Sequence, residues 1–268
     1  MKKGIVLVTA MMLLSMAGTA FALETDYGEL GVDFDATWVS KYIWRGFDLL
    51  DDKAAFQPSI NFDLFNSGFS VNVWSSFAGA SKNGGSLSTV DAEEWDYTVT
   101  YANSLFEGET YATDYAVSWV YYDFPDVASK DIDAQEFNID FSWPDICPFG
   151  TVPHYQYVYF YPAKGGGAVR SAQGFFHIFG ISYDLETPGI LSDSSEQIVS
   201  LSADLVYNDG ANGAAVDHDW SHILWGATTS VDLGPGTLTP GLYYQTSMDD
   251  SVNTEDELFC GISYGLSF

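Results

Sequence analysis

The sequence predicts an all-β fold: a twelve-stranded antiparallel up-and-down transmembrane β-barrel with short periplasmic turns and longer extracellular loops. Three observations predict it. Apolar and polar residues alternate with period two along twelve segments, short and long connections alternate between them, and Tyr and Trp gather at segment ends. Period-two alternation is typical of strands, because successive side chains point to opposite faces of a sheet. An even strand number with turns on one side and long loops on the other is typical of outer-membrane barrels.

Residues 1–22 are predicted to be a cleaved signal peptide, which leaves 23–268 as a single outer-membrane barrel domain. Lys2 and Lys3 precede an apolar stretch, and Ala20-Phe21-Ala22 is a small-x-small cleavage site. The alternative is a membrane anchor, which the apolar stretch is too short to form because a spanning helix needs ~20 residues. The sequence therefore predicts export to the bacterial outer membrane through the periplasm.

The first predicted strand lies within residues 29–46, where Leu30 and Val32 alternate with Asp33 and Asp35. The same alternation continues in "SINFDLF" (59–65), "FSVNVWSSF" (69–77) and "EWDYTVTYA" (94–102). Further strands are expected near 110–122, 135–143, 152–161, 174–185, 197–207, 220–233, 237–247 and 257–268.

The connections between these segments alternate in length. Short ones lie near 65–68, 103–109, 144–151 and 233–236, and longer polar ones near 46–54, 79–93, 122–134, 162–173, 208–219 and 247–256. Only the connection near 186–196 departs from the alternation, because it is longer than a tight turn.

The competing fold is a soluble β-sandwich, which also has short alternating strands. A sandwich would mix its aromatic residues with small aliphatic ones for packing, whereas here they concentrate at segment ends, as in a membrane-interface girdle. The predicted girdle consists of Tyr42, Trp44, Trp95, Tyr97, Trp119, Tyr121, Tyr157 and Tyr159, with Trp143 and Phe268 at the opposite end.

The last segment, 257–268, alternates up to Phe268. Because a barrel has no free edge, this strand is expected to pair with the first along its length. An alternating end with a terminal Phe also resembles the signature that the barrel assembly machinery recognises, so that machinery is an expected partner, with outer-membrane lipid and lipopolysaccharide.

The net charge of −28 becomes −30 once Lys2 and Lys3 are removed. Nothing in such a chain would neutralise phosphates, which excludes a nucleic-acid binder. The 16% aromatic content argues against an acidic disordered protein.

The segment "WVSKYIWRGFDL" (38–49), followed by "QPSINFDLFNSGFSVNVWSS", resembles the TorF-type porin family of bacterial outer-membrane barrels. Its hallmark, Ser-x-Tyr-x-x-Arg-Gly, is matched by Ser40, Tyr42, Arg45 and Gly46. The resemblance implies a porin-like protein in which Arg45 is a residue typical of the family. It does not indicate which solute passes.

The inward-facing set is dominated by small polar residues, so a narrow open pore is expected rather than a plugged barrel. Acids along this wall predict cation preference, with Lys41 and Arg45 facing some of them near a constriction. The alternative is that the acids only hydrate the wall. The predicted pore-lining residues are Asp33, Asp35, Lys41, Arg45, Asp63, Glu94, Asp96, Glu136, Asp140, Asp204 and Asp232.

The function predicted is passive diffusion of small solutes through a porin-like, cation-preferring channel. The alternatives are a non-conducting barrel that acts as an adhesion or scaffold protein and, third, a lipid-modifying enzyme. No catalytic residue, cofactor or metal site is expected. Ser221 and His222 are adjacent, and on a strand they would point to opposite faces. Cys147 and Cys260 are expected to lie too far apart for a disulfide.

Overall fold

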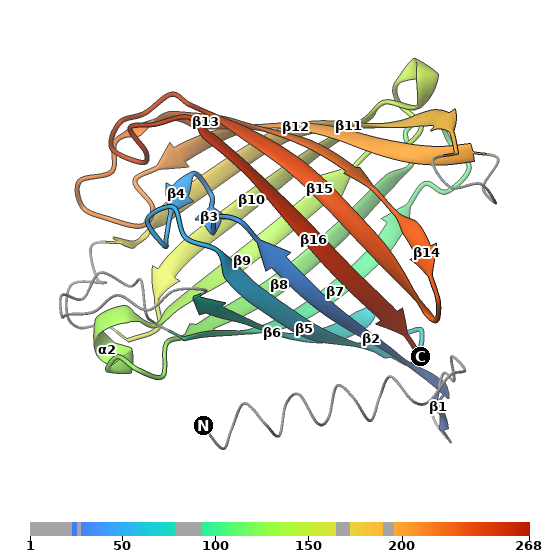
Figure 1. Cartoon of the computed structure of the whole chain (residues 1–268), viewed down its shortest axis with the longest axis horizontal. Helices are drawn as coiled ribbons and strands as arrows, with labels where there is room; N and C mark the ends of the chain where they lie inside the picture. Colours follow the sequence, from blue (N-terminus) through green and yellow to red (C-terminus); the bar gives the residue numbers. More distant parts are fainter. Residues whose placement is uncertain (1–22, 26–27, 79–92, 165–171, 190–195) are drawn as a thin grey trace.

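A computed structural model describes residues 23–25, 28–78, 93–164, 172–189 and 196–268, so the predicted signal peptide lies outside the described residues. Twelve antiparallel strands form a barrel (Figure 1). They are β2 (Gly28–Val39), β5 (Ala55–Leu64), β6 (Phe69–Ala78), β7 (Glu94–Leu105), β8 (Thr113–Asp123), β9 (Ala134–Ser142), β10 (Val152–Pro162), β11 (Gly174–Pro188), β12 (Glu196–Asp209), β13 (His218–Thr229), β15 (Gly236–Ser247) and β16 (Glu257–Ser267).

Six short elements of the described residues lie outside the twelve barrel strands. The strand β1 (Leu23–Thr25) pairs with β2, and β14 (Val231–Leu233) pairs with β15. The strands β3 (Ile43–Trp44) and β4 (Phe47–Asp48) form a separate hairpin. Two single-turn helices, α2 (Ser129–Ile132) and η2 (Pro148–Gly150), lie in connections. No helix in the described part of the chain has the length and apolar character needed to cross a membrane.

The sheet closes because β2 pairs with β5 on one side and with β16 on the other. The pairing with β16 continues to the last residue, where the Phe268 N–H donates to the Val32 carbonyl at 2.8 Å and the Val32 N–H donates back at 3.1 Å. Closure satisfies the backbone groups that an edge strand would expose. The predicted twelve-stranded closed barrel is therefore confirmed, as is the pairing of its last strand with its first.

The connections divide between the two ends of the barrel (Figure 1). At the long-loop end lie the connections 40–54, 124–133, 210–217 and 248–256, together with the end of β6, the start of β7, the end of β10 and the start of β11. At the short-turn end lie the connections 65–68, 106–112, 143–151 and 230–235, together with the end of β11, the start of β12, the start of β2 and the end of β16.

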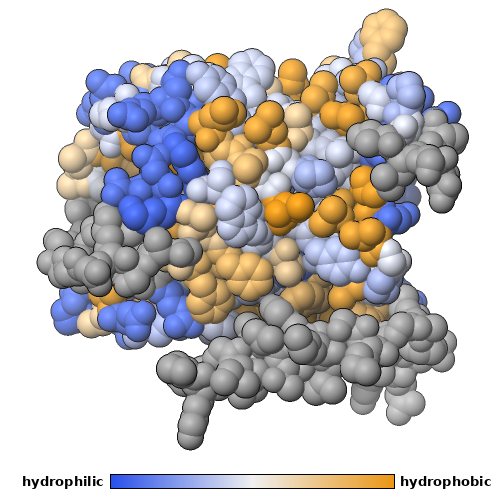
Figure 2. All heavy atoms as spheres, viewed as in Figure 1, coloured by the Kyte–Doolittle hydropathy of each residue, from blue (hydrophilic) through white to orange (hydrophobic). Residues whose placement is uncertain are grey.

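On the face of the barrel shown in Figure 2, most of the hydrophobic residues lie across the middle, and hydrophilic residues gather at the long-loop end. Large apolar side chains are exposed on many of the barrel strands, and their exposed fractions reach 44% for Trp38, 53% for Ile181 and 60% for Leu258. A soluble monomer rarely exposes a contiguous apolar surface of this extent. The barrel therefore has the exterior of a protein that is surrounded by lipid.

The inner surface follows from the strand register, because cross-strand partners share a face. Around the short-turn half, small polar residues face inward, for example Asn61 opposite Asp33 and Thr98 opposite Asn72. The long-loop half differs, because buried aromatic and aliphatic side chains line it. They belong to one cluster formed by Val120, Tyr122, Ala134, Val158, Phe160, Ala172, Phe176, Val206 and Ala211.

The first strand is shorter than the alternation predicted. It ends at Val39, and residues 40–54 then leave the wall instead of continuing as strand to residue 45. We call residues 40–54 the inward hairpin, since its side chains pack against the apolar cluster inside the barrel. The inward hairpin occupies part of this half of the lumen, which the alternation of residues did not predict.

Candidate functional site: an inward hairpin across the lumen

The inward hairpin begins with a fixed exit from the wall at Ser40. The Ser40 N–H donates to the Cys260 carbonyl at 2.8 Å, and the Ser40 hydroxyl oxygen accepts from the Cys260 N–H at 2.9 Å. The Ser40 hydroxyl thus accepts the hydrogen bond of a β16 backbone N–H at the point where β2 stops pairing with β16. Both cysteines among the described residues, Cys147 and Cys260, are free thiols, as expected.

Tyr42 lies inside the barrel and is buried. Its hydroxyl donates to Glu94 at 3.0 Å, and its ring centroid lies 5.8 Å from that of Trp74. The prediction that Tyr42 belongs to the lipid-facing girdle is therefore wrong. The cause is the turn of the chain at Ser40, which carries the following residues away from the wall.

Trp44 is also placed inside rather than in the girdle. Its ring centroid lies 6.0 Å from Tyr122, 5.6 Å from Phe160 and 5.8 Å from Phe176, all inward-facing residues of the wall. Aromatic contacts of this kind contribute about 0.5–1.5 kcal/mol each beyond area burial. Trp44 therefore anchors the inward hairpin to the wall formed by β8, β10 and β11.

The tip of the inward hairpin is the two-residue turn Arg45-Gly46, with φ of +47° and +97°. Positive φ at both central residues is typical of the type I′ turn, which matches the twist of the flanking strands. A Cβ on Gly46 would lie 2.6 Å from His222 Nδ1 and 2.8 Å from Val252 Cγ1. Only glycine therefore fits between the turn and the wall at β13.

Arg45 connects the tip to the opposite wall. Its Nη2 donates to Glu136 Oε2 at 2.8 Å, its Nε to Glu136 Oε1 at 3.2 Å, and its Nη1 to Gln156 at 3.3 Å. The guanidinium carbon also lies 5.2 Å from the Phe176 ring centroid. The fork-shaped guanidinium suits this two-oxygen contact with a carboxylate.

The other wall holds the turn through Gln245, whose Nε2 donates to the Gly46 carbonyl at 2.9 Å. Gln245 lies on β15, whereas Glu136 and Gln156 lie on β9 and β10. Because β9–β10 and β13–β15 are not neighbours in the sheet, the inward hairpin crosses the lumen.

Lys41 lies at the base of the inward hairpin. Its ammonium forms ion pairs with Asp52 and with Glu257, the latter at 2.6 Å. The hydrogen bond to Asp52, and to a smaller extent the hydrogen bond to Glu257, raises the pKa of Lys41 above its ordinary value. Asp48 lies close to the same two acids, in the one group of three potential metal ligands found among the described residues. The Lys41 ammonium pairs with two of these three carboxylates, Asp52 and Glu257.

The predicted pore-lining acids are spread over both halves of the barrel and one short strand outside it. Asp33, Asp35 and Asp63 face inward in the short-turn half on β2 and β5, whereas Glu94, Asp96 and Glu136 face inward in the long-loop half. Asp140 accepts from Gln156 at 2.6 Å, and Asp204 pairs with His154 at 2.7 Å. Asp232 lies on β14, outside the twelve barrel strands.

The remaining girdle candidates lie on the outside of the barrel or at its ends. Trp95, Tyr97, Trp119, Tyr121, Tyr157 and Tyr159 occupy the outward-facing positions of β7, β8 and β10, and Tyr97 and Trp119 are exposed. Trp143 follows β9 and stacks on Phe141, and Phe268 follows β16.

The sequence missed the contact between Ser221 and His222. The Ser221 hydroxyl and His222 Nδ1 are 2.8 Å apart, and both residues are buried. A register shift in the β12–β13 ladder opposite Val206 and Tyr207 brings the two side chains to the same side. Without that bulge they would point to opposite faces, as expected. Gly46 packs directly against the His222 ring, so the Ser221–His222 pair forms part of the surface on which the inward hairpin rests.

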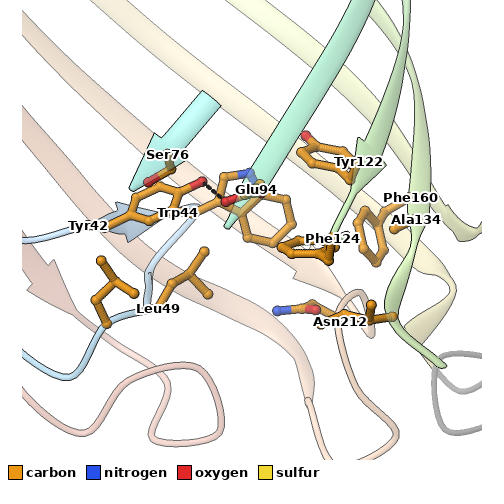
Figure 3. A pocket seen from close by; sticks show the side chains of 12 residues that line it. Tyr42, Trp44, Leu49, Ser76, Glu94, Tyr122, Phe124, Ala134, Phe160 and Asn212 are labelled. Carbon is orange, nitrogen blue, oxygen red and sulfur yellow. Dashed lines mark hydrogen bonds between the residues drawn. The ribbon is translucent and has the colours of Figure 1, made fainter. Parts of the chain in front are cut away.

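A cavity of about 250 Å³ lies between the inward hairpin and the wall at the long-loop end (Figure 3). Tyr42, Trp44 and Leu49 line it from the hairpin, and Glu94 and Phe160 from the wall. In Figure 3 the Tyr42 hydroxyl points to the Glu94 carboxylate.

Comparisons with known proteins agree with the barrel. Residues 28–160, just under half of the chain, match the model of a family described as "Bacterial protein of unknown function (Gcw_chp)". No curated protein matches the sequence. A structure described as "KdgM porin" is similar with a TM-score of 0.50 at 10% identity, covering 89% of this chain and 99% of that one.

A second similar structure is the COG4313 outer membrane channel from Pseudomonas putida F1. It has a TM-score of 0.50 at 8% identity over 89% of this chain and 94% of that one. Identities this low show the fold alone. The chain thus has the β-barrel fold of outer-membrane porins and channels, and over residues 28–160 it is similar to the Gcw_chp family.

Proposed function

We propose that this protein is a channel of the bacterial outer membrane through which small solutes diffuse, and that the inward hairpin forms its narrowest part. The inward hairpin carries the proposal: residues 40–54 cross a lumen whose short-turn half is lined by small polar side chains. A segment held across such a lumen limits the size of what can pass without filling the whole barrel. Membership of the TorF-type porin family, which the segment from Ser40 to Gly46 suggests, is part of this proposal.

The apolar outer surface supports the membrane location, and the fold neighbours are outer-membrane proteins. In that location the long-loop end would face the outside and the short-turn end the periplasm, as in bacterial barrels generally. The proposed surroundings are outer-membrane lipid and lipopolysaccharide, with delivery by the barrel assembly machinery through β16. No enzymatic activity is proposed.

We propose that the channel prefers cations. The acids Asp33, Asp35 and Asp63 face inward in the short-turn half, and Glu94 and Asp96 in the long-loop half. Arg45 and Lys41, the basic residues of the hairpin on this path, are each paired with acids already. The wall therefore retains net negative charge, which raises the local concentration of cations.

Removal of the inward hairpin tests the proposal. Val39 and Ala55 are direct cross-strand partners, so an Asn-Gly turn can replace residues 40–54 without moving β2 or β5. In planar lipid bilayers the wild type should conduct, and the shortened variant should conduct several-fold more because the narrowest part is gone.

A matched control shortens the opposite end of the barrel. Leu105 and Thr113 are also direct partners, so the same Asn-Gly turn can replace 106–112. This variant should conduct like the wild type. A wild-type barrel without conductance above background would contradict the proposal and favour the non-conducting scaffold. Equal conductance of wild type and hairpin variant would show that the hairpin is not the constriction.

A further inference from the structure

The cavity beside the inward hairpin has the features of a ligand site (Figure 3). Its volume of about 250 Å³ lies below the range of about 300–1,000 Å³ typical of pockets for drug-sized ligands. The ligand that fits it is therefore a small molecule. Residues from the 124–133 and 210–217 connections line it as well, which places it at the long-loop end.

Aromatic rings form much of the cavity wall. Trp44 meets Tyr122 nearly edge-on at 81° and Phe160 at 58°, while Tyr42 lines the same cavity from the inward hairpin. The faces of aromatic rings carry partial negative charge, so a cluster of them attracts cations. Such a wall also provides apolar surface for the body of a ligand.

Glu94 is the only carboxylate among the described residues that line this cavity. It is 5% exposed, and its one hydrogen bond within the described residues comes from the Tyr42 hydroxyl. An ionised carboxylate offers about four acceptor positions, so most of its capacity is unused. Asp96, the next inward residue of β7, has a buried Oδ1 without a hydrogen-bond partner in the described part of the chain.

No basic side chain of the described residues forms an ion pair with Glu94 or Asp96. Arg45, which lies on the inward hairpin nearby, is engaged by Glu136 through two hydrogen bonds. Buried negative charge is costly unless a positive charge or several donors accompany it. The cavity thus contains a buried carboxyl group in aromatic surroundings that has no cationic partner among the described residues.

We propose that this cavity binds a small organic cation, with its ammonium group on Glu94 and its apolar body against Trp44, Tyr122 and Phe160. A divalent metal ion fits less well, because Ca²⁺ and Mg²⁺ require six or more oxygen ligands and the cavity offers aromatic and aliphatic walls. A neutral apolar ligand would leave Glu94 without its missing partner. This binding site is independent of whether the channel conducts.

The test compares two ligands of nearly the same shape by isothermal titration calorimetry on the full barrel refolded in detergent. Phenethylammonium carries the charge, and 2-phenylethanol is its neutral counterpart. The wild type should bind phenethylammonium saturably and at least ten-fold more tightly than the alcohol. Glu94→Gln keeps an acceptor for Tyr42 and should weaken phenethylammonium at least ten-fold while changing the alcohol less than two-fold.

Asp184→Asn is the matched control, because it removes one inward-facing acid that accepts from Ser200 in the short-turn half, away from the cavity. It should change phenethylammonium binding less than two-fold. If Glu94→Gln does not refold, Tyr42→Phe provides the second variant: it frees Glu94 of its one donor and should bind phenethylammonium at least as tightly as the wild type. Equal affinity for both ligands, unchanged binding by Glu94→Gln, or weaker binding by Tyr42→Phe would overturn the proposal.

Discussion

Gly46 is the residue on which the position of the inward hairpin depends most directly. Its φ of +97° is unfavourable for residues with a Cβ, and a Cβ would also contact His222 and Val252 at less than 3 Å. The wall cannot retreat easily, because His222 is hydrogen-bonded to Ser221. Together these contacts explain why a glycine follows Arg45 in the sequence.

Gly46→Ala should therefore cost about 2–4 kcal/mol of unfolding free energy, combining a strained backbone with overpacking. Gly234→Ala is the control. Gly234 has a φ of +66°, and a Cβ there would have no neighbouring atom within 4 Å, so only the backbone cost of about 1 kcal/mol applies. Urea unfolding in lipid vesicles measures both. Equal losses for the two variants would show that the contact with His222 is unimportant.

At the scale of the hairpin, the Arg45–Glu136 pair is the main polar connection to β9. Glu136 is 1% exposed, so removal of Arg45 leaves a buried carboxylate without a partner. Breaking such a pair on one side costs about 3–5 kcal/mol, whereas removing both charges costs less than the sum of the single changes.

A double-mutant cycle with Arg45→Gln, Glu136→Gln and both together tests this connection. We expect a favourable coupling energy of about 1–3 kcal/mol from urea unfolding in vesicles. We also expect larger current fluctuations in either single variant, because the tip of the hairpin is released. Additive losses would mean that Arg45 and Glu136 stabilise the barrel independently, and that the hairpin is held mainly by Trp44.

The inward hairpin is also the element that sequence periodicity predicted incorrectly. Alternation continues from Trp38 through Tyr42 and Trp44, and period alone cannot distinguish a strand in the wall from one turned inward. A signal was present on the other side of the contact: Trp74 and Phe160 are bulky residues at inward positions of a mostly polar face. Such residues require an apolar partner inside the barrel, and Tyr42 and Trp44 supply it.

At the scale of the whole molecule, the barrel could be predicted because every strand repeats the same physical constraint of apolar outside and polar inside. Closure and strand number follow from that pattern and from the lengths of the connections. The contents of the lumen do not, since Glu136 and Gln156 on β9 and β10 are far in the sequence from Gln245 on β15, and all three contact the hairpin. Their roles depend on how the closed barrel places these strands around the hairpin.

The net charge of the molecule matters for transport only where acids face the path of the solute. Asp33 and Asp63 face inward near the short-turn end on neighbouring strands, whereas Glu107 and Glu109 lie on the exposed 106–112 turn at the same end. Fixed charges act over about 8–10 Å at physiological salt, so charges on the wall should influence ions in the lumen more than charges on the rim. The double variant Asp33→Asn/Asp63→Asn should therefore move the reversal potential in a KCl gradient toward zero, which is the value for a channel without ion selectivity. Glu107→Gln/Glu109→Gln, which removes the same charge, should leave it near the wild-type value. An anion-selective wild type, or equal shifts in the two variants, would show that wall acids do not set the selectivity.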